Sequence, residues 1–181
     1  MKIENYFNEY FSTIKRSLDF VNFRQLEKAI NLIEKVNRKG NKVIIVGNGG
    51  SASIASHLTV DFINAAKIKA INFNDSSIIT CFANDYGYSE CHSMAIEFYA
   101  DPMDLVILIS SSGESQNMLN AAQKANSLGL TVITLTGFNK NNSLSLMGDV
   151  NLWANSMSYN HVESAHQTWI LSIVDYIISK K

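Results

Sequence analysis

The sequence has little cysteine, almost no proline and no surplus of charge of either sign. Cys81 and Cys91 form neither a CxxC pair nor a disulfide framework, which is typical of a reducing compartment. Pro102 is the only proline and no low-complexity stretch marks a linker, so we expect residues 1–181 to form a single domain. With a formal net charge of -1, the chain lacks the basic field that direct binding of nucleic acid or anionic lipid requires.

Long hydrophobic runs are also missing from the sequence. No stretch of about 18 apolar residues occurs, and the first residues lack a basic region followed by an apolar one. We therefore expect no membrane segment and a cytoplasmic location. Hydrophobic residues make up 46% of the chain and charged residues 17%, which excludes a disordered chain and predicts a globular one.

The sequence does contain a regular alternation of helical and strand patterns. Apolar residues at helical spacing within residues 2–39, interrupted near residues 19–22, predict an N-terminal helical hairpin. The short β-branched runs that follow are typical of buried parallel strands. Their alternation with helices predicts an α/β fold of three layers, a doubly wound parallel sheet with helices on both faces. The expected strands are residues 42–46, 70–73, 104–109, 131–135 and 150–154, and the later helices are residues 52–66, 116–128 and 160–178.

The first expected strand stops in Gly-Asn-Gly-Gly-Ser, residues 47–51, where a helix begins. Backbone N–H groups at such a junction point at one spot beside the positive end of the helix, which favours anion binding. The run is not a dinucleotide-binding fingerprint, because Ala52 stands where a third glycine is required, and it lacks the Lys-Ser/Thr pair of a P-loop. We therefore predict no organic cofactor. Taken alone, the run also fits a tight turn with a serine N-cap.

A second polar turn favours the anion-binding interpretation. Residues 110–115, Ser-Ser-Ser-Gly-Glu-Ser, leave the next buried strand and open the next helix. Because the carboxyl ends of parallel strands meet at one edge of the sheet, both turns are expected there, where open α/β sheets bind ligands. The pair predicts a phosphate site.

Five motifs occur in order along the chain: Val46–Ser51, His57, Ala83–Gly87, Ile109–Ser115 and Val132–Gly137. With these motifs the sequence resembles the sugar isomerase (SIS) family and, within it, the phosphoheptose isomerase subgroup, over essentially the whole chain. The resemblance implies a SIS fold and an aldose–ketose isomerase converting sedoheptulose 7-phosphate to a mannoheptose 7-phosphate. It also implies a homotetramer assembled through the N-terminal hairpin (residues 1–39), sites at subunit interfaces and, in several members, zinc.

Matched position by position, the resemblance also implies which residues form the site. The substrate-binding positions are Asn48, Gly49, Gly50, Ser51, Asp85, Ser110, Ser111, Ser112 and Ser115. The catalytic positions match less closely. The family's histidine is His57, its glutamate base falls on Asp61 and its glutamine on Glu163, while its second histidine falls on Leu171.

Helical spacing allows the polar residues around this site to share a ligand. His57 and Asp61 are four residues apart, and Glu163 and His166 are three apart, so each pair lies on one helix face. Two imidazoles and two carboxylates could hold zinc, with His166 as the weakest member because it sits beside an apolar stripe and also fits a core histidine. His161, just before the terminal helix, is a further candidate for the missing acid.

Two functions stay open at this point. In an isomerase, Asp61 would act as the base, His57 would polarise the carbonyl with or without zinc, and Glu163 would position a hydroxyl, bind metal or share the proton transfer. The alternative is a non-catalytic sugar-phosphate-binding protein, a tetrameric partner of a replication initiator, because some relatives of the isomerase lack the histidine that Leu171 replaces here.

Overall fold

Buried aliphatic residues form a five-stranded parallel sheet in the computed structural model, which describes residues 2–180. The strand order is β2-β1-β3-β4-β5. The predicted α/β class is thereby confirmed, and each end of the expected strands lies within one residue of the observed end. The strands are β1 (Val43–Gly47), β2 (Ala70–Asn72), β3 (Leu105–Ser110), β4 (Thr131–Thr136) and β5 (Val150–Trp153). The helices are α1 (Ile3–Asp19), α2 (Phe23–Arg38), α3 (Gly50–Asn64), α4 (Ser76–Tyr86), α5 (Cys91–Tyr99), α6 (Gln116–Ser127) and α7 (Tyr159–Ser179), with short 3₁₀ turns at Tyr88–Glu90 and Leu144–Leu146.

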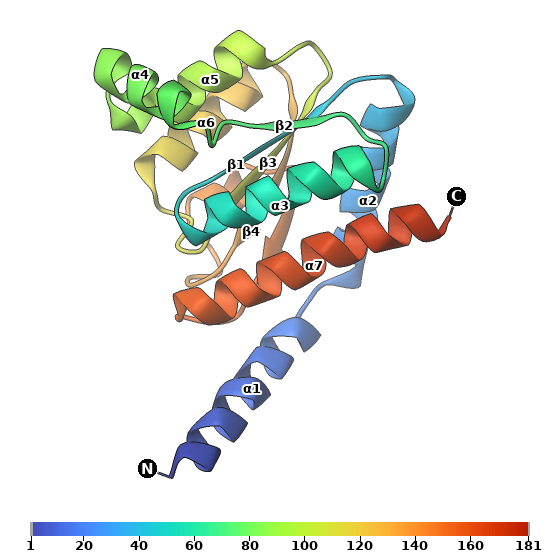
Figure 1. Cartoon of the computed structure of the whole chain (residues 1–181), viewed down its shortest axis with the longest axis vertical. Helices are drawn as coiled ribbons and strands as arrows, with labels where there is room; N and C mark the ends of the chain where they lie inside the picture. The colour runs from blue at the N-terminus through green and yellow to red at the C-terminus, as the bar shows by residue number, and fades with distance from the viewer. Residues whose placement is uncertain (1, 181) are drawn as a thin grey trace.

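The central strands are buried on both faces, so alternate side chains join two separate cores. Val43, Ile45 and Ile107 pack with residues of α2, α3 and α7 on one face. Ile44 and Val106 pack with residues of α5 and α6 on the other. This explains why the strands read as continuous apolar runs rather than as alternating ones. Figure 1 shows the helices on the two sides of the sheet.

The N-terminal helices do not lie side by side as a hairpin would. α2 covers the sheet, whereas α1 points away from the body and packs against α7 (Figure 1). The indole N–H of Trp169 on α7 donates to the carbonyl of Leu18 at the end of α1. Much of α1 stays uncovered, with Phe7 and Phe11 46% and 61% exposed.

The segment between β2 and β3 contains two helices that the apolar pattern did not predict. α4 has no buried residue, although α5 buries Ala95 and Ile96 against the sheet. The α4 N-cap is Asp75, whose carboxylate accepts from the N–H groups of Ser77 and Ile78. Asp75 therefore stabilises the start of α4 as its N-cap. Because α4 has only a weak apolar stripe, hydrophobic periodicity does not predict this helix.

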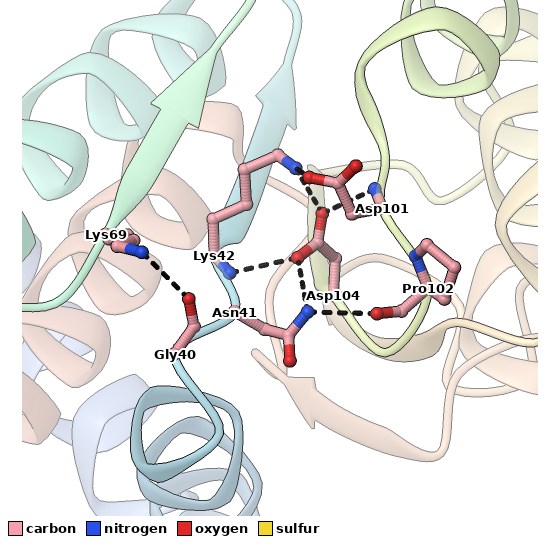
Figure 2. A network of polar contacts seen from close by, with 7 residues as sticks. All are labelled: Gly40, Asn41, Lys42, Lys69, Asp101, Pro102 and Asp104. Carbon is pink, nitrogen blue, oxygen red and sulfur yellow. Dashed lines mark hydrogen bonds and ion pairs between the residues drawn. The ribbon is translucent and has the colours of Figure 1, made fainter.

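A polar network closes the amino edge of the sheet, opposite the two polar turns. Figure 2 shows the buried carboxylate of Asp104 between the starts of β1 and β3. Asp104 accepts from the backbone N–H of Lys42 at 2.9 Å and from that of Asp101 at 2.8 Å, and it pairs with the Lys42 ammonium at 2.6 Å. Asn41 donates to the same carboxylate at 3.3 Å. These contacts fix the strands far from the candidate site, so their role is structural.

Candidate functional site

The first polar turn doubles back tightly as β1 ends and α3 begins. A Cβ on Gly47 would lie 2.7 Å from the backbone of Ser51, so the close approach requires glycine. Gly49, the N-cap of α3, has φ 54°, a conformation that L side chains rarely adopt. Ser51 is buried in the first turn of the helix. The turn thus brings backbone and hydroxyl groups to the amino end of α3.

The second polar turn is held by its own side chains. The hydroxyl of Ser110 accepts from the N–H of Gly113 at 3.2 Å, and that of Ser112 accepts from the N–H of Glu114 at 3.2 Å. Ser115 is the N-cap of α6 but makes no side-chain cap hydrogen bond. The hydroxyl of Ser111 is buried and has no hydrogen-bond partner in the described chain. Buried hydroxyl groups in proteins normally have a hydrogen-bond partner, so the Ser111 hydroxyl is a candidate donor to a bound anion.

The two turns meet around one small cavity at the carboxyl edge of the sheet, as the sequence predicted. Its volume is about 80 Å³. Two helix amino ends and several serine hydroxyls at one place suit a phosphate group. The cavity is lined by Asn48, Ser51, Ile109, Ser110, Ser111, Ser112, Ser115, Tyr159 and Glu163.

A loop that the sequence did not single out supports the second turn. The carboxylate of Glu114 accepts from the backbone N–H and the hydroxyl of Ser143, both at 2.8 Å. Gly113, with φ 68°, leaves no room for a Cβ because the amide of Asn142 lies against it. Glu114 is therefore a structural member of the serine-rich run.

Asn48 belongs to a side-chain network behind the cavity. Its amide pairs reciprocally with that of Asn117 on α6, at 2.9 and 3.0 Å. His92 on α5 and Tyr88 also reach its oxygen, at 3.1 and 3.2 Å. Burial lowers the pKa of His92 to about 4, so the ring is neutral at ordinary pH. The sequence motifs indicate Asn48 but not its three partners, because these contacts join segments far apart in the chain.

Glu163 of α7 joins this cavity to a larger one of about 550 Å³. Its carboxylate lies against Gly50, so closely that a Cβ at position 50 would be 2.6 Å from the carboxyl carbon. His57 and Gln167 face the larger cavity as well. A carboxylate and an imidazole therefore line one space beside the phosphate-sized cavity, which is an arrangement suited to proton transfer.

His57 on α3 contacts one residue of its own helix and one residue of α7. Its Nε2 lies 3.4 Å from a carboxylate oxygen of Asp61, and its Nδ1 lies 3.4 Å from the amide nitrogen of Gln167. Asp61 lines neither of the two cavities. The predicted i, i+4 pair exists, but in the single chain Asp61 reaches the site only through His57.

The four residues predicted to hold zinc are not gathered in the structure. Within residues 2–180, no three His, Cys, Asp or Glu side chains come together as a metal site. His166 is fully buried, its Nε2 is 2.9 Å from the carbonyl of Thr136, and burial lowers its pKa to about 4. Of the two alternatives for His166, a zinc ligand or a core histidine, the structure therefore shows the core histidine. Only His57 and Asp61 are adjacent, and two ligands do not fit a zinc site.

Two other predicted site residues lie away from the two cavities. Asp85, at the end of α4, is exposed and accepts a hydrogen bond from Asn84. The ring of His161 packs edge-on against Tyr10 at 4.6 Å, and its Nε2 is buried without a partner in the described chain. The single chain therefore does not bring Asp85 or His161 to the phosphate-sized cavity.

Comparison with known proteins agrees with this fold. A family model described as "SIS domain" matches residues 7–137. The chain therefore belongs to the SIS domain family.

Particular relatives and structures narrow the comparison further. A protein of Syntrophotalea carbinolica named phosphoheptose isomerase is 34% identical over 170 residues, covering 91% of this chain and 86% of that protein. A solved phosphoheptose isomerase structure from Francisella tularensis has a TM-score of 0.88 at 27% identity, covering 99% of this chain and 97% of the other. One from Neisseria gonorrhoeae has a TM-score of 0.90 at 25% identity, covering 98% and 97%. No helix in the described part of the chain is long and apolar enough to cross a membrane.

Proposed function

We propose that this protein is an aldose–ketose isomerase that converts sedoheptulose 7-phosphate to a mannoheptose 7-phosphate. Its family and the names of its relatives support the activity and the substrate. The observation that carries the proposal is the position of Glu163, which lines both the serine-walled cavity and the cavity that contains His57. The phosphate would enter the first and the reacting end of the sugar the second.

The reaction moves one proton between neighbouring carbons. A base removes a proton from C1 of the ketose, an enediol forms, and the proton returns to C2 while the hydroxyl proton passes from the oxygen on C1 to the oxygen on C2. The enzyme therefore needs a carboxylate beside C1 and C2 and a group that stabilises negative charge on the oxygens.

We assign the proton transfer to Glu163 and the oxygen contact to His57. Glu163 faces both cavities, whereas Asp61, the base favoured by the sequence, is in contact with His57 instead. Asp61 would then orient the His57 ring through the contact between its carboxylate and Nε2. No step requires a metal.

Leu171 marks the main departure from the family pattern. Its hydrocarbon side chain cannot supply a proton, and it is partly buried against the core. General acid help is worth about a hundredfold to ten thousandfold in rate. The proposal therefore includes a slow isomerase or one of altered substrate preference.

The proposal also includes a cytoplasmic homotetramer. Tyr6, Phe7 and Phe11 form an exposed aromatic face on α1, which a single chain leaves uncovered. Cys81 and Cys91 are free thiols, as in a reducing compartment.

The direct test is proton exchange with solvent. The protein is mixed with sedoheptulose 7-phosphate in heavy water, and deuterium at C1 and C2 is followed by NMR. We expect exchange in the wild type, its loss in Glu163→Gln, and a smaller loss in Asp61→Asn. If Asp61→Asn abolishes exchange while Glu163→Gln retains it, the two carboxylates have the opposite roles.

The alternative of a non-catalytic protein that partners a replication initiator is not favoured, since the relatives found are named as isomerases. It would be supported only if the wild type bound sugar phosphates tightly without any exchange.

A further inference from the structure

His92 is a buried histidine whose partner lies in the candidate site. Its side chain is on α5, outside both polar turns, and is 4% exposed. Its Nε2 lies 3.1 Å from the amide oxygen of Asn48. Asn48 in turn lines the phosphate-sized cavity. The His92 ring is therefore separated from the cavity by one side chain, that of Asn48.

The oxygen of the Asn48 amide has more hydrogen-bond partners than its nitrogen. Its oxygen is approached by the Tyr88 hydroxyl, the His92 ring nitrogen and the Asn117 amide nitrogen, at 3.2, 3.1 and 3.0 Å. Its nitrogen has one partner in the described chain, the amide oxygen of Asn117 at 2.9 Å. An asparagine nitrogen carries two hydrogens. One N–H of Asn48 therefore remains for a ligand in the cavity.

The orientation of this amide depends on the proton of His92. When the His92 proton is on Nε2, the ring donates to the Asn48 oxygen. Turning the Asn48 amide around would then place its NH₂ group against the N–H of His92. A neutral ring carries one ring N–H proton, so this contact requires the Nε2–H tautomer. The amide pair with Asn117 then connects the first turn to the start of α6, which follows the second turn.

We propose that His92 is a positioning residue that turns the N–H of Asn48, rather than its carbonyl, toward an anionic oxygen of the bound phosphate. The inference deepens the proposed function but rests only on its phosphate-binding part. His92 does not touch the ligand. It acts through Asn48, and through Asn117 it also holds the two turns at a fixed separation.

Binding of inorganic phosphate, measured by titration calorimetry, tests this without any turnover. His92→Phe fills a similar space but cannot donate, so we expect phosphate binding to weaken by about tenfold or more, the effect of losing a hydrogen bond to a charged group. His92→Gln keeps an N–H near the Nε2 position and should stay within about threefold of the wild type. Tyr88→Phe is the matched control, since it removes a donor to the same oxygen from a side chain that is 59% exposed. It should change binding by less than about twofold.

Nitrogen NMR of the wild-type ring gives a test that needs no variant to fold. We expect the Nε2–H tautomer and no protonation between about pH 5.5 and 8, because the pKa is lowered to about 4 by burial. An Nδ1–H tautomer would overturn the proposal. So would a His92→Phe variant that melts like the wild type and binds phosphate equally well. Absence of isomerase activity, with these binding differences intact, would reject the proposed reaction and leave the role of His92 supported.

Discussion

Replacing Gly50 with alanine should separate the stability of the protein from its activity. Gly50 is the first residue of α3, and its backbone is not in the positive-φ region, so alanine fits the helix. A Gly→Ala change at a compatible position stabilises a protein by about 0.4–1 kcal/mol, mainly by reducing the freedom of the unfolded chain. The added methyl group, however, would occupy the space of the Glu163 carboxylate.

The size of the displacement follows from the contact distances. The new Cβ would lie 2.6 Å from the carboxyl carbon of Glu163, and ordinary contact begins at 3.4 Å. The carboxylate must therefore move by at least roughly 0.8 Å, since its Oε2 lies closer to the new Cβ than the carboxyl carbon does, and because it ends a flexible side chain it can do so cheaply. A misplacement of about 1 Å in a reacting group costs on the order of a hundredfold in rate.

We expect Gly50→Ala to melt at or above the wild-type temperature while deuterium exchange into sedoheptulose 7-phosphate slows by about a hundredfold. The double variant Gly50→Ala with Glu163→Ala should be no slower than Glu163→Ala alone, because both changes act on one group. Full exchange in Gly50→Ala, with normal folding, would show that the position of Glu163 is irrelevant to the reaction.

Further substitutions test other parts of the structure. Ser111→Ala removes a buried hydroxyl without a partner, so it should not lower the melting temperature, yet phosphate binding measured by calorimetry should weaken by about 1.5–3 kcal/mol; undiminished binding would exclude Ser111 from the site. Asp104→Ala should lower the free energy of unfolding in urea by about 1–3 kcal/mol for each backbone N–H that loses its buried acceptor, those of Lys42 and Asp101, while the Lys42 ammonium keeps its contact with Asp101. The control Asp101→Ala removes an exposed carboxylate and should cost at most about 1 kcal/mol, so equal losses would contradict the assignment. Burial works to lower the pKa of Lys42, but its contacts with Asp101 and Asp104 raise that pKa above the ordinary value of 10.5. The contribution of Lys42 to stability is therefore complete below pH 10.5 and is lost as the pH rises through the pKa of the folded protein. Above pH 10.5, the urea midpoint of unfolding should fall less steeply with pH in Asp104→Asn than in the wild type. Phe11→Asp should reduce the oligomer seen by light scattering, whereas an unchanged mass would remove α1 from the interface.

Local sequence determined the strands and the two polar turns. Uninterrupted apolar runs such as residues 43–46 suit strands covered on both faces, and glycine and serine after a buried strand favour a tight junction with the following helix. The meeting of the turns also followed, because the carboxyl ends of parallel strands lie at one edge. The family resemblance was readable for the same reason, since its motifs are these junctions.

The roles of individual polar side chains depended on tertiary structure. Helical spacing placed His166 and Glu163 on related faces of α7, yet one is fully buried and the other lines two cavities. A spacing of three residues shows that two side chains share a helix face, but it does not show which of them is buried in the core and which lines a cavity. Asp61 shows the same limit, because its spacing predicted contact with His57 but not its distance from the cavities.

The network behind Asn48 was beyond sequence analysis altogether. Asn48, His92 and Asn117 come from the end of β1, from α5 and from α6, and no spacing relates them. Only the packing of α5 and α6 on one face of the sheet brings their polar ends together. Local residue chemistry therefore predicted where an anion could bind, whereas long-range packing decided which side chains contact Asn48.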